Sequence, residues 1–345
     1  MSAAGSDWRP TGTRAMLEQR AQLLSRTRRF FADRKVLEVD TPTVVNAPVT
    51  DVHIHSARVD LTDGEPAART YFLHTSPEYA MKRLLAAGSG DIYQICHVVR
   101  GFERGRLHNP EFTLIEWYRI GFSLDQLMLE VDALVRELAG ARAGSWTSER
   151  LTYREAFLRE LQLDPFTARM EVLATAAGRL GWRPPAATGA SLAAGAPGPT
   201  HPEEAGLRDE LLEFLMGTFV GPRLGRERLT FVRGYPATQA ALARIDSVDS
   251  RAALRFELYC QGIELANGFH ELANAAEQRS RFEKDVAERR RRGLPTYEPD
   301  ERLLSALESG MPDCTGVAVG FDRVAMLAAG ADRIDEVLAF PTERA

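Results

Sequence analysis

Residues 104–119 read RGRLHNPEFTLIEWYR, a short stretch that mixes arginine, histidine, glutamate and aromatic side chains. Side chains alternate between the two faces of a β-strand. A strand over 112–119 therefore places Phe112, Leu114, Glu116 and Tyr118 on one face. A carboxylate between two aromatic rings is costly if it is buried without a partner. This face is predicted to be the floor of a pocket that holds a cation and a flat ring. The alternative is an ordinary strand whose Glu116 reaches solvent.

The composition is that of a soluble globular protein with one large domain or two ordinary ones. The chain has 345 residues, of which 44% are hydrophobic and 26% are charged. Its net charge of −5 gives no global indication of binding to nucleic acid or to a membrane surface. The three cysteines, Cys96, Cys260 and Cys314, lack the spacing of a metal site and are expected to be reduced thiols in the cytoplasm. Neither a signal peptide nor a membrane-spanning run is predicted.

The first half of the chain alternates predicted helices and strands. Helices are expected over 14–35 and 123–138, and strands over 36–45, 91–100 and 112–119. Pro42 interrupts the strand over 36–45, so it is expected where the strand bends or meets a partner chain. Residues 71–85 predict a strand followed by a helix, with Ser76 as cap, Pro77 at the first helical position and Glu78 in the first turn. Capping alone would explain these three residue types.

The second half begins with the Ala-, Gly- and Pro-rich segment 182–206, which is predicted to be a flexible surface insertion. Helices are expected over 207–217 and 274–292, and strands over 229–235 and twice within 255–272, around a turn at Gln261–Gly262. Residues 316–331 predict a strand that runs into a helix. The basic run over 289–292 is predicted to be a solvated helix end, with a docking patch for an acidic partner as the alternative.

The predicted strands are grouped in mostly antiparallel order with helices around them, which is typical of an α+β domain. The sequence contains neither the phosphate-binding loop signature GxxxxGK[ST] nor the dinucleotide signature GxGxxG. It also has no cluster of cysteine and histidine with the spacing of a zinc site.

Five segments together carry a resemblance to a known family. FFADRKVLEVDTP (30–42), VVRGFERGRLHNPEFTLIEWY (98–118) and GVAVGFDRVAMLAAG (316–330) resemble motifs 1, 2 and 3 of class II aminoacyl-tRNA synthetases. TSPEYAMKRLL (75–85) and GIELANGFHEL (262–272) resemble the lysine-specific branch. Motif 1 begins within about the first thirty residues, so no anticodon-binding domain is expected ahead of it. The chain is thus similar to the truncated paralogues, the elongation factor P–(R)-β-lysine ligase family.

The resemblance implies a class II catalytic fold, with a mostly antiparallel sheet flanked by helices. It implies one catalytic domain over 1–345, a homodimer built through motif 1, and no recognition of a tRNA anticodon. It also implies that ATP and Mg²⁺ activate (R)-β-lysine, or lysine, as an adenylate. The acyl group then passes to a lysine side chain of elongation factor P in the cytoplasm, with no membrane involved.

The resemblance also assigns residues to the nucleotide. Arg100 would hold the α-phosphate and Arg323 the γ-phosphate, with His108 supporting the outer phosphates. Phe112 would stack on adenine, with Arg323 on its other side. Asn109, Leu265 and Gly320 would complete the nucleotide site, and Glu264, together with Glu271, is assigned to Mg²⁺. Two of these residues also have structural alternatives: Arg323 could complement Asp322 or Glu343, and His108 could be a hydrogen-bonding loop residue.

The amino acid has two ammonium groups, and the resemblance supplies carboxylates for them. Glu78 and Glu271 would meet the amines, Tyr118 would offer a hydroxyl group, and Glu116 would support them. Ser76, Pro77 and Ala318 would also line this pocket. Lysyl-tRNA synthetases usually have glycine where this chain has Ala318, and alanine suits the shifted amine of a β-amino acid. Glu264 and Glu271 are seven residues apart, so an ideal strand would place them on opposite faces. A bulge at Asn267–Gly268 would reconcile them.

The chain departs from the family in motif 2. The family's Arg-Asn-Glu is here Arg100-Gly101-Phe102, with Glu103 one place later. Three explanations stay open: Glu103 serves after a shift of the loop, adenine is held by backbone and stacking, or adenylation is weakened. Two alternatives to the leading function also stay open. One is a lysine-activating ligase with another acceptor, and the other is a catalytically retired paralogue that binds a ligand or a partner.

Overall fold

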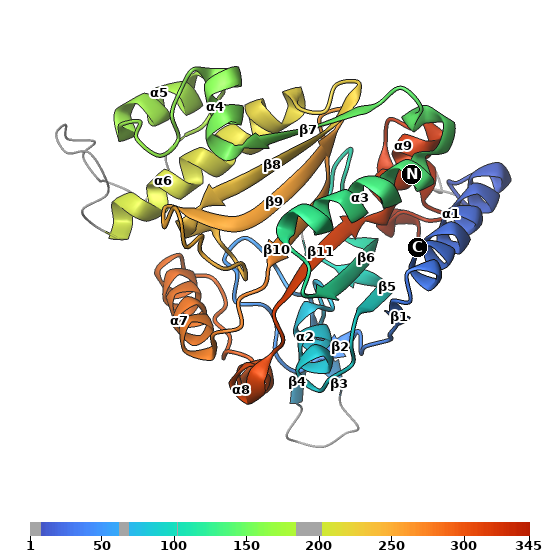
Figure 1. Cartoon of the computed structure of the whole chain (residues 1–345), viewed down its shortest axis with the longest axis horizontal. Helices are drawn as coiled ribbons and strands as arrows, with labels where there is room; N and C mark the ends of the chain where they lie inside the picture. The colour runs from blue at the N-terminus through green and yellow to red at the C-terminus, as the bar shows by residue number, and fades with distance from the viewer. Residues whose placement is uncertain (1–7, 62–68, 102, 184–201) are drawn as a thin grey trace, which may run out of the picture. The chain divides into compact units, whose positions relative to one another are not determined.

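The computed structural model describes residues 8–61, 69–101, 103–183 and 202–345 (Figure 1). The chain divides into two compact units, one formed by 1–144 with 271–345 and the other by 145–270. The expectation of a single catalytic domain over 1–345 stays a prediction. Across the described ranges, no helix has both the length and the apolar character needed to cross a membrane.

The sheet of the first unit has the strand order β1-β5-β6-β11. Its strands are β1 (Leu37–Glu38), β5 (Ile92–Val99), β6 (Glu111–Ile120) and β11 (Cys314–Gly320). The β5–β6 and β6–β11 pairs are antiparallel, and only the short β1 pairs in parallel with β5. A second, three-stranded antiparallel sheet has the order β2-β4-β3, with β2 (Val44–Val45), β4 (Arg69–Leu73) and β3 (Arg58–Leu61). The predicted strand over 36–45 is therefore divided near Pro42 between two sheets.

Three helices of this unit pack together: α1 (Arg14–Asp33), α3 (Leu124–Ala139) and α9 (Phe321–Ala329). The other three, α2 (Glu78–Ala86), α7 (Ala275–Arg291) and α8 (Glu301–Gly310), form a second group in which α8 contacts both of the others. The odd-numbered side chains of β6 face α3. Trp117 donates to the Glu130 carboxylate at 3.0 Å, and Arg119 forms an ion pair with Glu130 at 3.4 Å. The predicted alternation along β6 is thus present, and it leaves the even-numbered face for the candidate site.

The second unit has the strand order β10-β9-β8-β7. The strands are β7 (Thr147–Thr152), β8 (Arg228–Pro236), β9 (Ala252–Cys260) and β10 (Ile263–His270), and the helices are α4 (Tyr153–Leu161), α5 (Met170–Arg179) and α6 (Pro202–Leu215). Side chains from these helices and β8, among them Phe157, Leu211 and Val232, form its hydrophobic core. The predicted turn between β9 and β10 is confirmed: Gln261 and Gly262 both have left-handed backbones, with φ of 52° and 73°.

Two predicted boundaries are wrong. Helix α6 begins at Pro202, inside the predicted insertion, and ends at Leu215, where a π-helical segment over 216–220 follows. Proline followed by two glutamates is a typical helix start, but the Ala- and Gly-rich residues before it concealed this signal. Residues 184–201 of the insertion and Phe102 of motif 2 lie outside the described residues. Pro77 is the N-cap of α2 rather than its first helical residue, so Ser76 lies one place before the cap, although its hydroxyl accepts a hydrogen bond from the Glu78 amide at 3.0 Å, as predicted for a cap.

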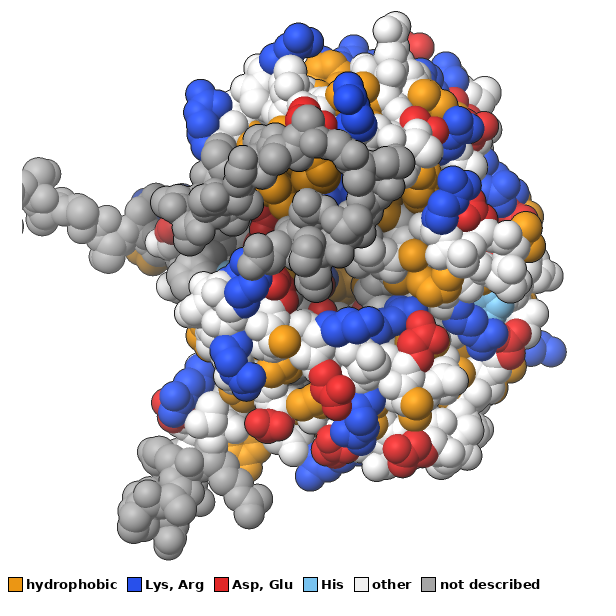
Figure 2. Space-filling model, turned by 90° about the vertical axis from the view of Figure 1, so that its left-hand side faces the viewer, with side chains coloured by type: hydrophobic (Ala, Val, Ile, Leu, Met, Phe, Trp, Pro, Cys, Tyr) orange, Lys and Arg blue, Asp and Glu red, His pale blue; other side chains and the backbone are white. Residues whose placement is uncertain are grey.

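The basic run at the end of α7 is only partly solvated. Arg289 is fully buried and donates hydrogen bonds of 2.6 Å to the carbonyl oxygens of Pro295 and Asp51. The prediction of a solvated helix end is therefore wrong for Arg289, because the carbonyl groups replace water around its guanidinium. Arg291 and Arg292 pair with Glu288 along the helix. On the face drawn in Figure 2, Lys and Arg side chains alternate with Asp and Glu.

Candidate active site

The even-numbered face of β6 carries rows of side chains that the register aligns with its neighbours. One row joins Gln94, Glu116 and Ala318, and the next joins Ile92, Tyr118 and Gly316. Glu116 is only 2% exposed, and both of its oxygens accept hydrogen bonds, from Ser76 Oγ and from the Tyr118 hydroxyl, each at 2.7 Å. The alternative in which Glu116 reaches solvent is wrong.

A buried lysine links two of the predicted amine-binding carboxylates. Lys82 lies one turn after Glu78 on α2, and its Nζ is 2.8 Å from Glu78 Oε1 and 2.6 Å from Glu271 Oε2. Lys82 and Glu271 are each 1% exposed. The unit therefore gathers Glu78, Glu116 and Glu271 around one ammonium group, beside the Tyr118 hydroxyl. This is an arrangement suited to binding cations.

The pKa values of these groups reflect burial and mutual repulsion. Burial, with repulsion from Glu78, raises the pKa of Glu116 to about 7. Burial also raises the pKa of Glu271 to about 8, although the ammonium group of Lys82 opposes this. Burial alone would lower the pKa of Lys82, but Glu271 and Glu78 outweigh it and hold the pKa above its usual value. Near neutral pH, Lys82 is charged and the carboxyl groups of Glu116 and Glu271 are partly protonated.

Gly316 allows the close approach of Tyr118 and Glu271. A Cβ atom built at Gly316 would overlap the Tyr118 ring and would lie 2.5 Å from Glu271 Oε1. Glycine is therefore required on β11 for the carboxylate and the phenol to lie side by side.

The other end of the same face carries the predicted phosphate-binding residues. The Arg100 guanidinium lies 5.2 Å from the centroid of the Phe112 ring. Arg323, in the first turn of α9, donates to His108 Nε2 at 2.7 Å. The acids proposed as alternative partners of Arg323 have arginines of their own, since Asp322 pairs with Arg20 and Glu343 with Arg104.

His108 is a neutral acceptor in this arrangement. Burial, together with the positive charges of Arg323 and Arg100, lowers the pKa of His108 to about 4. Its main chain also forms hydrogen bonds with Gly105, so it closes the loop as well as contacting Arg323. Two cations thus converge at this end, as an anionic polyphosphate requires.

Asn109 lies in the same loop, but its amide is directed into the protein. Its Nδ2 donates to the carbonyl oxygen of Glu111 at 2.5 Å, and its Oδ1 accepts from the Thr342 amide at 3.1 Å. In this structure Asn109 joins the motif 2 loop to the C-terminal segment. Its direct contact with a nucleotide stays a prediction.

Comparison with known proteins agrees with this geometry. The model for class II tRNA synthetases (D, K and N) matches residues 4–344. A protein named elongation factor P–(R)-β-lysine ligase from Vibrio cholerae is 49% identical over 99% of both chains. Proteins of the same name from Edwardsiella ictaluri and Proteus mirabilis are 47% and 48% identical, also over 99% of both chains.

The chain belongs to the elongation factor P–(R)-β-lysine ligase family. The resemblance of its five sequence segments to this family is confirmed, and so is the predicted α+β class II synthetase fold with a mostly antiparallel sheet.

The Mg²⁺ assignment of Glu264 and Glu271 stays a prediction, as do the nucleotide roles of Glu103, Leu265 and Gly320. Glu264 and the buried Leu265 lie on β10 of the second unit. The register of β10 with β9 shifts between Glu264 and Ala266. The irregularity therefore lies earlier in the strand than the bulge predicted at Asn267–Gly268. Within the described ranges, no three His, Cys, Asp or Glu side chains form a metal-binding group. One carboxylate with substrate phosphates often suffices for Mg²⁺, and the Glu271 carboxylate already pairs with Lys82.

Two residues of the candidate site, Lys82 and Gly316, were not predicted from the sequence of this ligase-family chain. For Lys82, the signal was its spacing of four from Glu78 beside the buried Met81 and Leu85. For Gly316, it was a glycine aligned with Tyr118 on the neighbouring strand.

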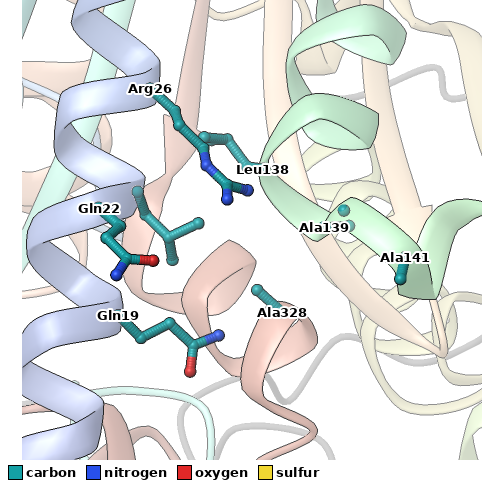
Figure 3. Close-up of a pocket in the computed structure, with 9 residues that line it drawn as sticks. Gln19, Gln22, Arg26, Leu138, Ala139, Ala141 and Ala328 are labelled. Atoms are coloured by element: carbon teal, nitrogen blue, oxygen red, sulfur yellow. The ribbon is translucent and has the colours of Figure 1, made fainter.

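A separate cavity of about 250 Å³ lies among α1, the end of α3 and α9 (Figure 3). Gln19, Gln22 and Arg26 extend towards it from α1, and Ala328 borders it on α9. None of the residues that the sequence assigned to the ligase site lines this cavity.

Proposed function

We propose that this chain uses ATP to activate (R)-β-lysine as an aminoacyl-adenylate and transfers the acyl group to a lysine side chain of elongation factor P. The observation that carries the proposal is the shared face of β6. The buried carboxyl groups of Glu116 and Glu271 gather at one end of it with the partly buried Glu78, and Arg100, Arg323 and His108 gather at the other. Strand β6 extends about 14 Å from Phe112, at the end with the arginines, to Glu116, at the end with the carboxylates.

The first chemical step joins two anions, so catalysis depends on positioning and on charge neutralisation. The carboxylate of β-lysine attacks the α-phosphorus of ATP and pyrophosphate leaves. Arg100 neutralises the α-phosphate and orients the attacking carboxylate, while Arg323 binds the terminal phosphate. Neutral His108 orients the Arg323 guanidinium. Mg²⁺, when bound with ATP, supplies further charge neutralisation of the phosphates, and Glu264 is the carboxylate that we assign to it.

The second step transfers the acyl group. The neutral ε-amine of the acceptor lysine attacks the carbonyl carbon of the adenylate, an amide bond forms, the bond between the carbonyl carbon and the phosphate oxygen breaks, AMP leaves with that electron pair, and the amine loses one proton to solvent. During both steps Glu78, Glu271 and Tyr118 hold the ammonium groups of the amino acid. We assign Glu271 to the amine pocket rather than to Mg²⁺, because its carboxylate pairs with Lys82 and adjoins Tyr118.

The acceptor is tested by incubating the chain with elongation factor P, ATP, Mg²⁺ and (R)-β-lysine, and by measuring the intact mass of the acceptor. We expect an increase of one β-lysyl group. Elongation factor P with arginine in place of its loop-tip lysine is the control and should keep its mass. An unmodified acceptor, with adenylate formation intact, would favour a ligase with another acceptor.

The donor is tested with Ala318→Gly. Ala318 lies directly opposite Glu116 on β11, so removal of its methyl group changes the pocket floor next to the carboxylates. We expect this variant to shift its preference from (R)-β-lysine towards lysine in adenylate formation. An unchanged preference would remove Ala318 from the assignment.

We also propose that the chain acts as a homodimer in the cytoplasm. Exposed apolar side chains on the short strands after α1, Leu37 and Val44, support a partner surface near motif 1. The cytoplasmic assignment follows from ATP as co-substrate and from a translation factor as acceptor.

A further inference from the structure

We propose that Lys82 is a positioning residue for the diamino-acid substrate: its buried ammonium group holds the carboxyl groups of Glu78 and Glu271 side by side, so that they can receive the ammonium groups of the ligand. This inference rests on the proposed function, which supplies a ligand with two ammonium groups. Lys82 itself touches neither ATP nor the reacting carboxylate in this assignment.

The geometry separates Lys82 from an ordinary surface ion pair. Lys82 is 1% exposed, and its Nζ lies within 2.8 Å of carboxylate oxygens from two different segments of the chain. Glu78 precedes it by one turn of α2, whereas Glu271 comes from the segment that begins after β10 and donates its backbone amide to Cys314. The ammonium group therefore fixes two segments at the positions from which their carboxylates can bind an amine.

More carboxyl groups than ammonium groups lie around Lys82. Three carboxylates face the cluster, those of Glu78 and Glu271 beside Lys82 and that of Glu116 from β6. Tyr118 on β6, Cys96 on β5 and Tyr79 on α2 also adjoin these carboxylates, and burial keeps all three neutral near pH 7. With all three carboxyl groups ionised, they carry two more negative charges than the Lys82 ammonium group neutralises. That number equals the two ammonium groups of a diamino acid.

The pH dependence of ligand binding follows from these charges. Burial raises the pKa of Glu116 to about 7 and that of Glu271 to about 8, so the ligand-free pocket holds protons near neutral pH. A ligand with two positive charges favours the ionised carboxylates and displaces these protons. Binding should therefore strengthen as pH rises from 6 to 8 and should release protons. The side-chain amine of the ligand titrates near pH 10, so it stays charged over this range.

Removal of the Lys82 charge should shift the pH dependence of diamino-acid binding to higher pH. The ammonium group lowers the pKa of both Glu271 and Glu116, so without it each carboxyl group holds its proton to a higher pH. A shift of one pKa unit corresponds to about a tenfold change in an equilibrium constant. We therefore expect Lys82→Met to weaken diamino-acid binding about tenfold or more at pH 7, and to recover part of that loss by pH 9.

The experiment is calorimetric titration of the full chain with (R)-β-lysine, lysine and norleucine, which lacks the side-chain amine, from pH 6 to pH 9. The variants are Lys82→Met, Lys82→Arg, which keeps the charge, and Arg83→Met as a control, since Arg83 is exposed on the same helix. ATP binding is titrated in parallel. Wild type should prefer a diamino acid over norleucine, Lys82→Met should lose much of that preference, and Lys82→Arg should restore it. Arg83→Met should behave as wild type, and ATP binding should not change.

A Lys82→Met variant with the same pH midpoint as wild type and an unchanged or tighter Kd would overturn the inference while leaving the proposed function intact. Wild-type protein that binds neither diamino acid at any pH would overturn both. If Lys82→Met does not fold, the wild type still decides the question together with Lys82→Arg. Affinity that does not depend on pH, with no proton release between buffers of different ionisation enthalpy, would contradict the charge balance described here.

Discussion

At the scale of single residues, the hydrogen-bonded pair of Arg323 and His108 lies at the proposed phosphate end of the site. Arg323→Ala removes one of two converging cations and leaves the neutral His108 without its donor. Loss of a preorganised charge contact typically reduces the rate about 100-fold or more. We expect adenylate formation, measured by ATP–pyrophosphate exchange, to fall by at least this factor. Arg83→Ala, an exposed arginine on α2, is the control. Normal exchange in Arg323→Ala would remove Arg323 from the site.

A second prediction at the scale of single residues concerns Gly316. A methyl group at Gly316 would displace Tyr118 and Glu271, and overpacking of this kind costs about 1–3 kcal/mol. Gly316→Ala should therefore raise the KM for the amino acid about tenfold or more and leave the KM for ATP unchanged. Gly178→Ala on α5 is a matched control, because no atom outside its own helix lies within 4 Å of the new methyl group. Equal KM values in wild type and Gly316→Ala would show that the close approach is not needed.

The sequence was sufficient to predict those site residues whose positions follow from local rules. Alternation along β6 was sufficient to place Glu116 and Tyr118 on one face. Lys82 was missed because a lysine on an amphipathic helix normally extends its ammonium group to water. Its burial depends on Glu271, which is far along the chain, and no local pattern reports such a contact.

At the scale of elements, the end of α7 supports the motif 2 loop through a chain of contacts. Arg289 holds the carbonyl oxygens of Asp51 and Ile54, and the carbonyl oxygen of His55 accepts from the amide of Gly101. Gly101 follows Arg100 directly. The position of Arg100, which we propose binds the α-phosphate, thus depends on a helix end that is remote in sequence.

Arg289→Met tests this support. Loss of hydrogen bonds from a buried cation should cost about 3 kcal/mol of unfolding free energy and should raise the KM for ATP more than the KM for the amino acid. Thermal unfolding and exchange kinetics measure both effects. Arg290→Met is the matched control, since Arg290 is exposed in the same basic run. Unchanged stability and KM values in Arg289→Met would contradict the role of this helix end.

Element boundaries were predictable where turn chemistry is strong and less so elsewhere. The turn at Gln261–Gly262 and the interruption at Pro42 follow from backbone preferences. The start of α6 at Pro202 was obscured by the composition of the preceding segment, and the burial of Arg289 required knowledge of the 51–55 loop.

At the scale of the whole molecule, a homodimer is the expected state. The exposed apolar residues Leu37, Val44 and Leu61 lie on β1, β2 and β3, and apolar surface of this kind is typical of obligate interfaces. Light scattering at micromolar protein should give the mass of two chains, and Leu37→Glu should lower it. A monomeric mass for the wild type would contradict the dimer.

The most direct test of the central claim is ATP–pyrophosphate exchange by the purified protein with Mg²⁺, comparing (R)-β-lysine, lysine and no amino acid. We predict exchange that requires a diamino acid and is fastest with (R)-β-lysine, because the proposed site joins a cation-binding pocket to two arginines placed to bind phosphates. Absence of exchange with both diamino acids would contradict the account and would show that the altered motif 2 no longer supports adenylate formation.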